Sequence, residues 1–196
     1  MRIDHVLYAV SDLDAGATRF EEELNLESVP GGRHPAWGTA NRIVPLGPDY
    51  LELVGVADPI VAAASEFGRL VLDAGDRLVG WAVATDDLGA VAARLGLELQ
   101  RGSRTRPDGV RLAWRLAGLA ESLRSGGALP FFIQWDGPAE LHPGGDSSRP
   151  AGISWVEVGG DESRLREWLG RSDLPLRFTS AETGITAVGI GDVVLV

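Results

Sequence analysis

The stretch MRIDHVLYAVSDLDAGATRFEEEL, residues 1–24, sets a pattern that the rest of the chain repeats. Apolar residues dominate positions 3–10, which is the composition of a buried strand. Alternation along this strand predicts that His5 shares a face with Ile3 and Leu7. Ser and Asp residues follow, and their side chains can accept hydrogen bonds from the free N–H groups at a helix start. The predicted unit is therefore a strand followed directly by an amphipathic helix.

Three further strands complete the first unit. Residues 26–29 are predicted to form a short strand that the Pro-Gly-Gly of residues 30–32 closes, and residues 33–38 are predicted to be a loop. Residues 39–46 and 50–56 are predicted to pair across the Gly-Pro-Asp turn between them. The order of elements in this first unit is therefore β-α-β-β-β.

The same order recurs twice with loose spacing, so internal repetition sets the fold class as α+β. Residues 1–135 are predicted to hold two paired β-α-β-β-β units. Residues 136–150, rich in Pro, Gly and Ser, are predicted to be a linker. Residues 151–196 are predicted to form a third, partial unit that packs on the same domain.

Composition limits the chemistry that the chain can perform. The net charge of −10 opposes nucleic acid as a partner, because phosphate binding needs a cationic face. No apolar run has the length of a membrane span and no signal peptide is evident, so we expect a cytoplasmic protein. The chain has no Cys and no Lys, which excludes thiolate and Schiff-base chemistry. Acid–base or metal chemistry must then use Asp, Glu, Tyr or the histidines His5, His34 and His142.

Several motifs resemble the vicinal oxygen chelate superfamily, which includes glyoxalase I, extradiol dioxygenases and bleomycin-resistance proteins. They are Asp4-His5 in the first strand, VSDLD at residues 10–14 and YLEL at residues 50–53. More narrowly, PGGRHPAWGTAN at residues 30–41, FFIQW at residues 131–135 and His142-Pro143 resemble a bacterial glyoxalase-like domain. The resemblance implies two paired units whose curved mixed sheet forms a cup with helices outside.

The resemblance also implies a divalent metal in the cup, held by His5 and by Glu52, which could in addition shuttle a proton. Imidazole and carboxylate ligands suit Zn, Ni, Co, Mn or Fe. Aligning residues 10–13 with residues 85–88 places Gly80 opposite His5, and the counterpart of Glu52 falls at Gln134. Gln134 and His142 are therefore the candidate further ligands.

His5, Glu52 and His142 have alternative interpretations, and for His142 the alternative is a surface histidine. His5 could be a hydrogen-bonded core residue. Glu52 lies between two leucines in a strand, where a carboxylate costs several kcal/mol unless it is paired or ligated. An ion pair with Arg42 or Arg33 would satisfy it without a metal.

Candidate substrate contacts come from the loop and from the later strands. Trp37 could stack on a ligand and Arg33 could pair with its carboxylate, unless the loop packs on itself with Trp37 in the core. Five arginines between residues 101 and 115 could form an anion-attracting rim or a solvated hairpin. The candidate substrate-binding residues are Arg33, His34, Trp37, Asn41 and Trp135.

The leading functional hypothesis is a metal-dependent lyase, isomerase or dioxygenase that acts on a small oxygen-bearing metabolite. The alternative is a metal-free protein of the bleomycin-resistance type that sequesters a small molecule, and Gly80 and the acidity favour it. A third interpretation is a structural or interaction module whose cup is filled by its own side chains or by a second chain. Either of the first two predicts a small-molecule partner, and the resemblance leaves a homodimer open.

Overall fold

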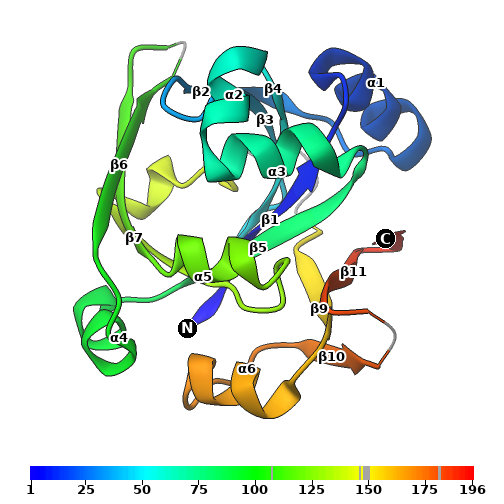
Figure 1. Cartoon of the computed structure of the whole chain (residues 1–196). Coiled ribbons are helices and arrows are strands. Elements are labelled where there is room, and N and C mark those ends of the chain that lie inside the picture. The colour runs from blue at the N-terminus through cyan, green and yellow to red at the C-terminus, as the bar shows by residue number, and fades with distance from the viewer. Residues whose placement is uncertain (107, 146, 148–150, 181) are drawn as a thin grey trace.

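The computed structural model describes residues 1–106, 108–145, 147, 151–180 and 182–196 (Figure 1). Within these residues no helix has the length and apolar character needed to cross a bilayer. The helices are α1 (Leu13–Leu24), α2 (Pro59–Ala64), α3 (Glu66–Ala74), α4 (Leu88–Leu95), α5 (Leu119–Arg124) and α6 (Glu162–Leu169), with a 3₁₀ turn, η1, at Ala139–Leu141. The strands are β1 (Arg2–Ala9), β2 (Val29–His34), β3 (Thr39–Pro45), β4 (Tyr50–Val56), β5 (Arg77–Ala84), β6 (Gln100–Thr105), β7 (Arg111–Ala117), β8 (Phe131–Asp136), β9 (Ile153–Gly159), β10 (Leu176–Thr179), β11 (Gly184–Ile190) and β12 (Val193–Leu195).

Two β-α-β-β-β units meet at the centre of one curled sheet, as predicted. The described residues form an eight-stranded sheet in the order β2-β3-β4-β1-β5-β8-β7-β6. The central strands β1 and β5 are antiparallel, and each is flanked by a parallel strand, β4 or β8, from its own unit. Because His5 pairs with Ala82 and Leu7 pairs with Gly80, a twofold rotation that exchanges the two strands places Gly80 on His5. The mixed α+β fold class is confirmed.

Helices cover both faces of this sheet. Phe20 of α1 and Leu88 of α4 pack with Val6 in one core. Phe67 of α3 belongs to a second core with Leu7, on the opposite face, where α5 also packs. Figure 1 shows α2 and α3 lying together across this second face. The second core closes part of the concave face and leaves a confined space between the two units.

β1 contains a bulge at Asp4. Ile3 pairs with Val83 and His5 pairs with Ala82, so one extra residue lies between them without a partner of its own on β5. The extra residue shifts the alternation, and Ile3 lies in the same core as Val6, away from the face of His5. The prediction that Ile3 and His5 share a face is therefore wrong. The bulge also lets the neighbouring Asp4 and His5 side chains meet.

β2 begins at Val29, so residues 26–28 of the predicted strand 26–29 lie outside it, and it runs through the predicted turn. Its residues include the Pro-Gly-Gly segment and continue to His34, and the pairing with β3 shifts between Pro30 and Arg33. A Cβ atom at Gly31 would overlap the Asn41 side chain, so a glycine is required for the close approach of the two strands. The predicted loop over residues 33–38 is wrong for its first two residues because a bulged strand tolerates this composition.

The third unit has the predicted order of elements, β9-α6-β10-β11-β12, but pairs its strands differently. Its sheet runs β10-β9-β11-β12, with β9 and β10 adjacent and parallel. Val188 of β11 and Leu165 of α6 share a core with Trp81 of β5. Residues 146 and 148–150 of the predicted linker lie outside the described residues, and the boundaries of the proposed domain division stay a prediction.

Asp49 joins the β3–β4 turn to the third unit, and its environment predicts a stability that depends on pH. Its buried carboxylate accepts the Ile153 N–H at 3.0 and 3.1 Å. Burial raises the pKa of Asp49 to about 6, although the Ile153 N–H acts in the opposite direction. A carboxyl with a raised folded-state pKa stabilises the fold most when it is protonated, so this contribution is complete below about pH 4 and is lost as the pH rises through about 6.

We expect Asp49→Asn to remove this pH dependence. The free energy of unfolding of the wild type should fall by roughly 1–2 kcal/mol more than that of the variant between pH 4 and pH 8. Urea unfolding at both pH values measures the difference. If the free energy of unfolding changes equally in wild type and Asp49→Asn between pH 4 and pH 8, the pH dependence comes from other groups.

Candidate functional site

A small pocket lies on the concave face between the first two units. Its volume is about 60 Å³, which is room for about two water molecules and hence for only the reacting end of a ligand. The wall is largely aromatic, with Trp37, Phe67, Trp114, Phe131 and Trp135. The polar side chains that line it are His5, His34, Asn41, Tyr50, Glu52 and Arg104.

His5 is held by its chain neighbour. Its Nδ1 lies 2.7 Å from Asp4 Oδ1, so Nδ1 donates to the carboxylate and Nε2 carries the lone pair. His5 Nε2 lies 3.8 Å from Glu52 Oε2. The His5 ring also stacks on Tyr50, with 4.5 Å between ring centroids, which fixes its plane. The imidazole therefore presents a basic nitrogen to the pocket beside a carboxylate.

Asp4 is the centre of a buried hydrogen-bond network. Its carboxylate is 0% exposed and accepts from His5, from His142 Nε2 at 3.0 Å and from Trp135 Nε1 at 3.1 Å. Burial alone would raise the pKa of Asp4, but the hydrogen bonds that His142 and His5 donate to the carboxylate outweigh burial and hold the pKa well below its usual range. Asp4 is therefore ionised and orients His5.

Glu52 is positioned by an amide, and among the described residues no arginine pairs with it. Asn41 Nδ2 donates to Glu52 Oε1 at 2.7 Å, and Asn41 Oδ1 accepts the Gly32 N–H at 2.6 Å. This leaves Oε2 as the oxygen that faces His5. Arg42 donates to Ser28 at 2.9 Å and Arg33 is exposed, so the alternative ion pair does not form within the described residues.

The structure brings most of the predicted site residues together. His5, Glu52, His34, Trp37, Asn41 and Trp135 all line the pocket. His34 lies 3.0 Å from Thr39 Oγ1, and burial lowers its pKa, which favours the neutral ring.

Gln134, Arg33 and His142 lie elsewhere. Gln134 is on the opposite face of β8 from Ile133 and Trp135, and its amide holds the start of α4 by accepting the Leu88 N–H at 3.1 Å. Arg33 is exposed. His142 lies on the far side of Asp4, and its Nδ1 accepts the Gly144 N–H at 3.2 Å. Gln134 thus faces away from Glu52, Arg33 is in solvent, and His142 is held by its hydrogen bonds beyond Asp4.

Three residues that sequence reasoning did not select also build the site. Asp4 was missed because regular alternation points it away from His5, and the sequence carries no signal for the bulge. Tyr50 could have been found, since alternation places it on the face of Glu52. Arg104 belongs to the arginine group between residues 101 and 115, but nothing in the sequence distinguishes it from the other four.

The residues present do not fit a resident divalent metal. Leu7 pairs with Glu52 in the first unit, and Ala82 pairs with Phe131 in the second. Because Ala82 is the counterpart of Leu7, the counterpart of Glu52 is Phe131. The second unit therefore offers Gly80 and Phe131 where the resemblance implies ligands. In the part of the chain that the structure describes, no group of three or more His, Cys, Asp or Glu side chains could hold a metal ion.

We expect the purified protein to hold little metal. After incubation with Zn²⁺, Mn²⁺ or Ni²⁺ and dialysis, wild type and Glu52→Gln should both retain far less than one ion per chain, because two protein ligands hold a labile ion weakly. Inductively coupled plasma mass spectrometry measures the content. One ion per wild-type chain that is absent from the Glu52→Gln variant would show that Glu52 belongs to a metal centre.

Residues 3–172 match the sequence model of a family described as a glyoxalase-like domain. No curated protein matches the chain. A hypothetical protein from Staphylococcus aureus is 16% identical, with 93% of this chain and 88% of that chain covered and a TM-score of 0.71.

Epimerases are among the other similar structures. Methylmalonyl-CoA epimerase from Mycobacterium tuberculosis is 20% identical over 71% of this chain and 89% of its own, with a TM-score of 0.50. A variant of the Streptomyces coelicolor enzyme, in complex with 2-nitronate-propionyl-CoA, is 19% identical over 68% and 96%, with a TM-score of 0.51. Such likeness shows a shared fold. Because the family model matches most of its length, the chain belongs to the glyoxalase-like domain family.

Proposed function

We propose that this protein catalyses proton transfer at a carbon next to a carbonyl group of a small metabolite, without a resident divalent metal. The observation that carries the proposal is the Asp4–His5–Glu52 arrangement at the pocket, with His5 Nε2 and Glu52 Oε2 3.8 Å apart. Two adjacent proton acceptors that are oriented by buried hydrogen bonds are suited to general base catalysis.

In this mechanism Glu52 is the base. Its Oε2 takes a proton from the carbon, and the electron pair of the broken C–H bond moves onto the carbonyl oxygen as an enolate. Burial raises the pKa of Tyr50 well above its usual value, so its phenol stays protonated and can donate a hydrogen bond to that oxygen. Return of the proton from Glu52 to the same face of that carbon exchanges its hydrogen without inverting the centre. Where that carbon carries a hydroxyl group, His5 Nε2 takes the hydroxyl proton and passes it to the enolate oxygen, while Glu52 returns its proton to the former carbonyl carbon, which completes an isomerisation.

His5 supports the base. Because Asp4 keeps the proton on Nδ1, Nε2 is free to accept the proton that Glu52 has taken, or that of a substrate hydroxyl group. The methylmalonyl-CoA epimerases of the same fold are, by name, enzymes that invert a centre in a CoA ester. Their chemistry supports the reaction class proposed here.

Hydrogen–deuterium exchange tests this function. Methylmalonyl-CoA, the hemithioacetal of methylglyoxal and glutathione, and 4-methyl-2-oxopentanoate are incubated with the protein in D₂O, with and without EDTA, and followed by ¹H NMR. We expect exchange at the carbon next to the carbonyl group for at least one compound, unchanged by EDTA. Exchange that EDTA abolishes would indicate a metal-dependent enzyme instead.

A second candidate is metal-free sequestration of a small molecule. The observation that favours it is the aromatic wall, in which Trp37, Trp114 and Trp135 face one pocket. Binding of a compound at micromolar concentration, without exchange of any of its protons, would favour this function over catalysis.

A further inference from the structure

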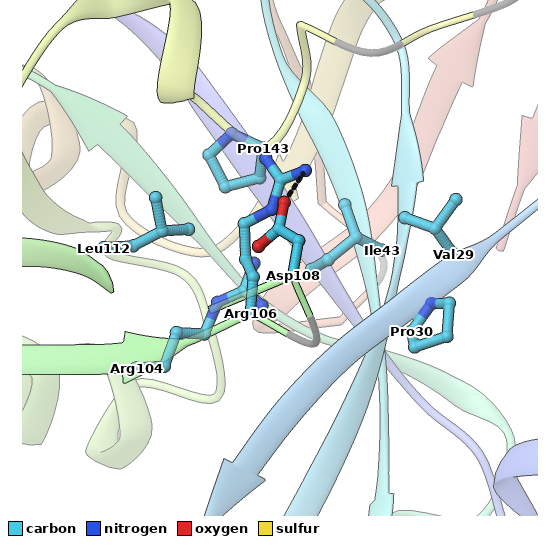
Figure 2. A pocket seen from close by; sticks show the side chains of 8 residues that line it. All are labelled: Val29, Pro30, Ile43, Arg104, Arg106, Asp108, Leu112 and Pro143. Carbon is cyan, nitrogen blue, oxygen red and sulfur yellow. Dashed lines mark ion pairs between the residues drawn. The ribbon is translucent and has the colours of Figure 1, made fainter. Parts of the chain in front are cut away.

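Arg104 lies where two cavities adjoin. It lines the inner pocket of about 60 Å³, which holds Glu52, and an outer cavity of about 240 Å³ (Figure 2). Ile43 is the other residue that both cavities share. A ligand that extends from the outer cavity to Glu52 therefore passes the Arg104 side chain.

The guanidinium of Arg104 has N–H donors that are available to a ligand. Its Nη1 donates to the Gly31 carbonyl at 2.6 Å, and within the described residues no carboxylate lies at ion-pair distance from it. The neighbouring Arg106, in contrast, pairs with Asp108 at 3.0 Å, the dashed contact in Figure 2. An arginine carries five N–H donors, so one neutral acceptor leaves most of them available to a ligand.

Burial of the Arg104 guanidinium carries an energetic cost. Arg104 is half-buried, and burial lowers the pKa of its guanidinium, while the charge of Glu52 acts against that shift. Taking a cation out of water without an anionic partner is unfavourable. Gly32 leaves room for the side chain, because a Cβ atom there would lie 3.2 Å from Arg104 Cδ. The fold thus holds a cation beside the pocket at a cost that a bound anion would offset.

The outer cavity has mainly apolar walls. Figure 2 shows Leu112 on one side and Ile43, Val29 and Pro30 on the other, with the charged side chains between them. A ligand that fills this space would bury hydrocarbon against the walls and place an anionic group at the guanidinium.

We propose that Arg104 binds the carboxylate of the substrate, which makes the substrate an oxo or hydroxy carboxylic acid with a short apolar chain. This inference rests on the proposed function, because it places the oxygen-bearing end of such an acid beside Glu52. The apolar chain occupies the outer cavity, and the guanidinium accounts for the selection of an acid over a neutral analogue.

A purely structural role makes a different prediction. The hydrogen bond to Gly31 joins β6 to β2, at the two ends of the eight-stranded sheet, so Arg104 also helps to close the cup. Loss of that link would lower stability and weaken the binding of charged and neutral ligands alike. Only an anion-binding role makes the loss depend on ligand charge.

The test compares one acid with its ester. 4-Methyl-2-oxopentanoate and its methyl ester are titrated against the protein and followed by the fluorescence of the tryptophans that line the pocket. The proteins are wild type, Arg104→Gln and the control Arg101→Gln, which removes the same charge from an exposed position on β6. We expect wild type to bind the acid at least ~10-fold more tightly than the ester, and Arg101→Gln to match it.

Arg104→Gln should lose at least ~10-fold in affinity for the acid and almost none for the ester. Equal affinity of wild type for the two ligands, binding of neither, or an equal loss for both in the variant would overturn the proposal. If Arg104→Gln does not fold, Arg104→Lys retains the charge and must keep the preference for the acid. Binding is scored without turnover, so a preference for the acid with no C–H exchange in any of the three compounds would reject the proposed function and keep the anion site.

Discussion

Glu52→Gln is expected to lower C–H exchange in D₂O by at least ~100-fold while ligand binding stays within a few-fold of wild type. The glutamine oxygen can still accept from Asn41 Nδ2, so the side chain keeps its position. Its amide nitrogen replaces the oxygen that faces His5, and an amide cannot take a proton from carbon. The variant therefore removes the base and leaves the pocket in place.

The matched control is Glu22→Gln, the same substitution on the exposed surface of α1. Exchange is measured by ¹H NMR and binding by tryptophan fluorescence. A Glu52→Gln protein that exchanges within ~10-fold of wild type would exclude Glu52 as the base, since general base catalysis contributes ~100-fold or more.

Asp4→Asn should have the largest effect on stability. The buried carboxylate accepts hydrogen bonds from His5, His142 and Trp135, and an amide cannot accept all three. We expect the free energy of unfolding to fall by about 3 kcal/mol at pH 7. Asparagine would also favour the other tautomer of His5, with the proton on Nε2, so exchange should fall as well.

The effect of Asp4 on stability should depend on pH. Because its folded-state pKa is depressed, the stability it contributes is present above the unfolded-state pKa near 3.8 and is lost as the pH falls toward the folded-state value. The difference between wild type and Asp4→Asn should therefore be largest at pH 7 and smaller at pH 3, as measured by urea unfolding. Asp14→Asn on exposed α1 is the control. A difference that is constant with pH would show that the pKa of Asp4 is not depressed in the folded protein.

Local patterns predicted one half of the candidate site. Alternation in β4 puts Tyr50 and Glu52 on one face and Leu51 on the other, and the structure places them so. Amphipathic spacing likewise predicted the core face of α1. These features depend on residues that are close in sequence, where a period of 2 or 3.6 decides which side chains are buried.

The other half depended on register. The sequence alignment put Gln134 opposite Glu52, whereas the pairing of β8 with β5 makes Phe131 the counterpart and turns Gln134 to the other face. A shift of an odd number of residues in a strand moves a side chain from one face to the other. Sequence spacing across the inserted α5 could not fix that register.

The sequence by itself determined the repeated β-α-β-β-β units, the exclusion of thiol and lysine chemistry, and the presence of His5 and Glu52 on strands that face a common space. Only the tertiary structure decided that the bulge brings Asp4 to His5, that Phe131 occupies the second ligand position, and that Arg104 alone of five neighbouring arginines lines the inner pocket. The physical reason is that periodicity is a local property of the chain, whereas bulges, register and the closing of the sheet depend on hydrogen bonds between segments far apart in sequence.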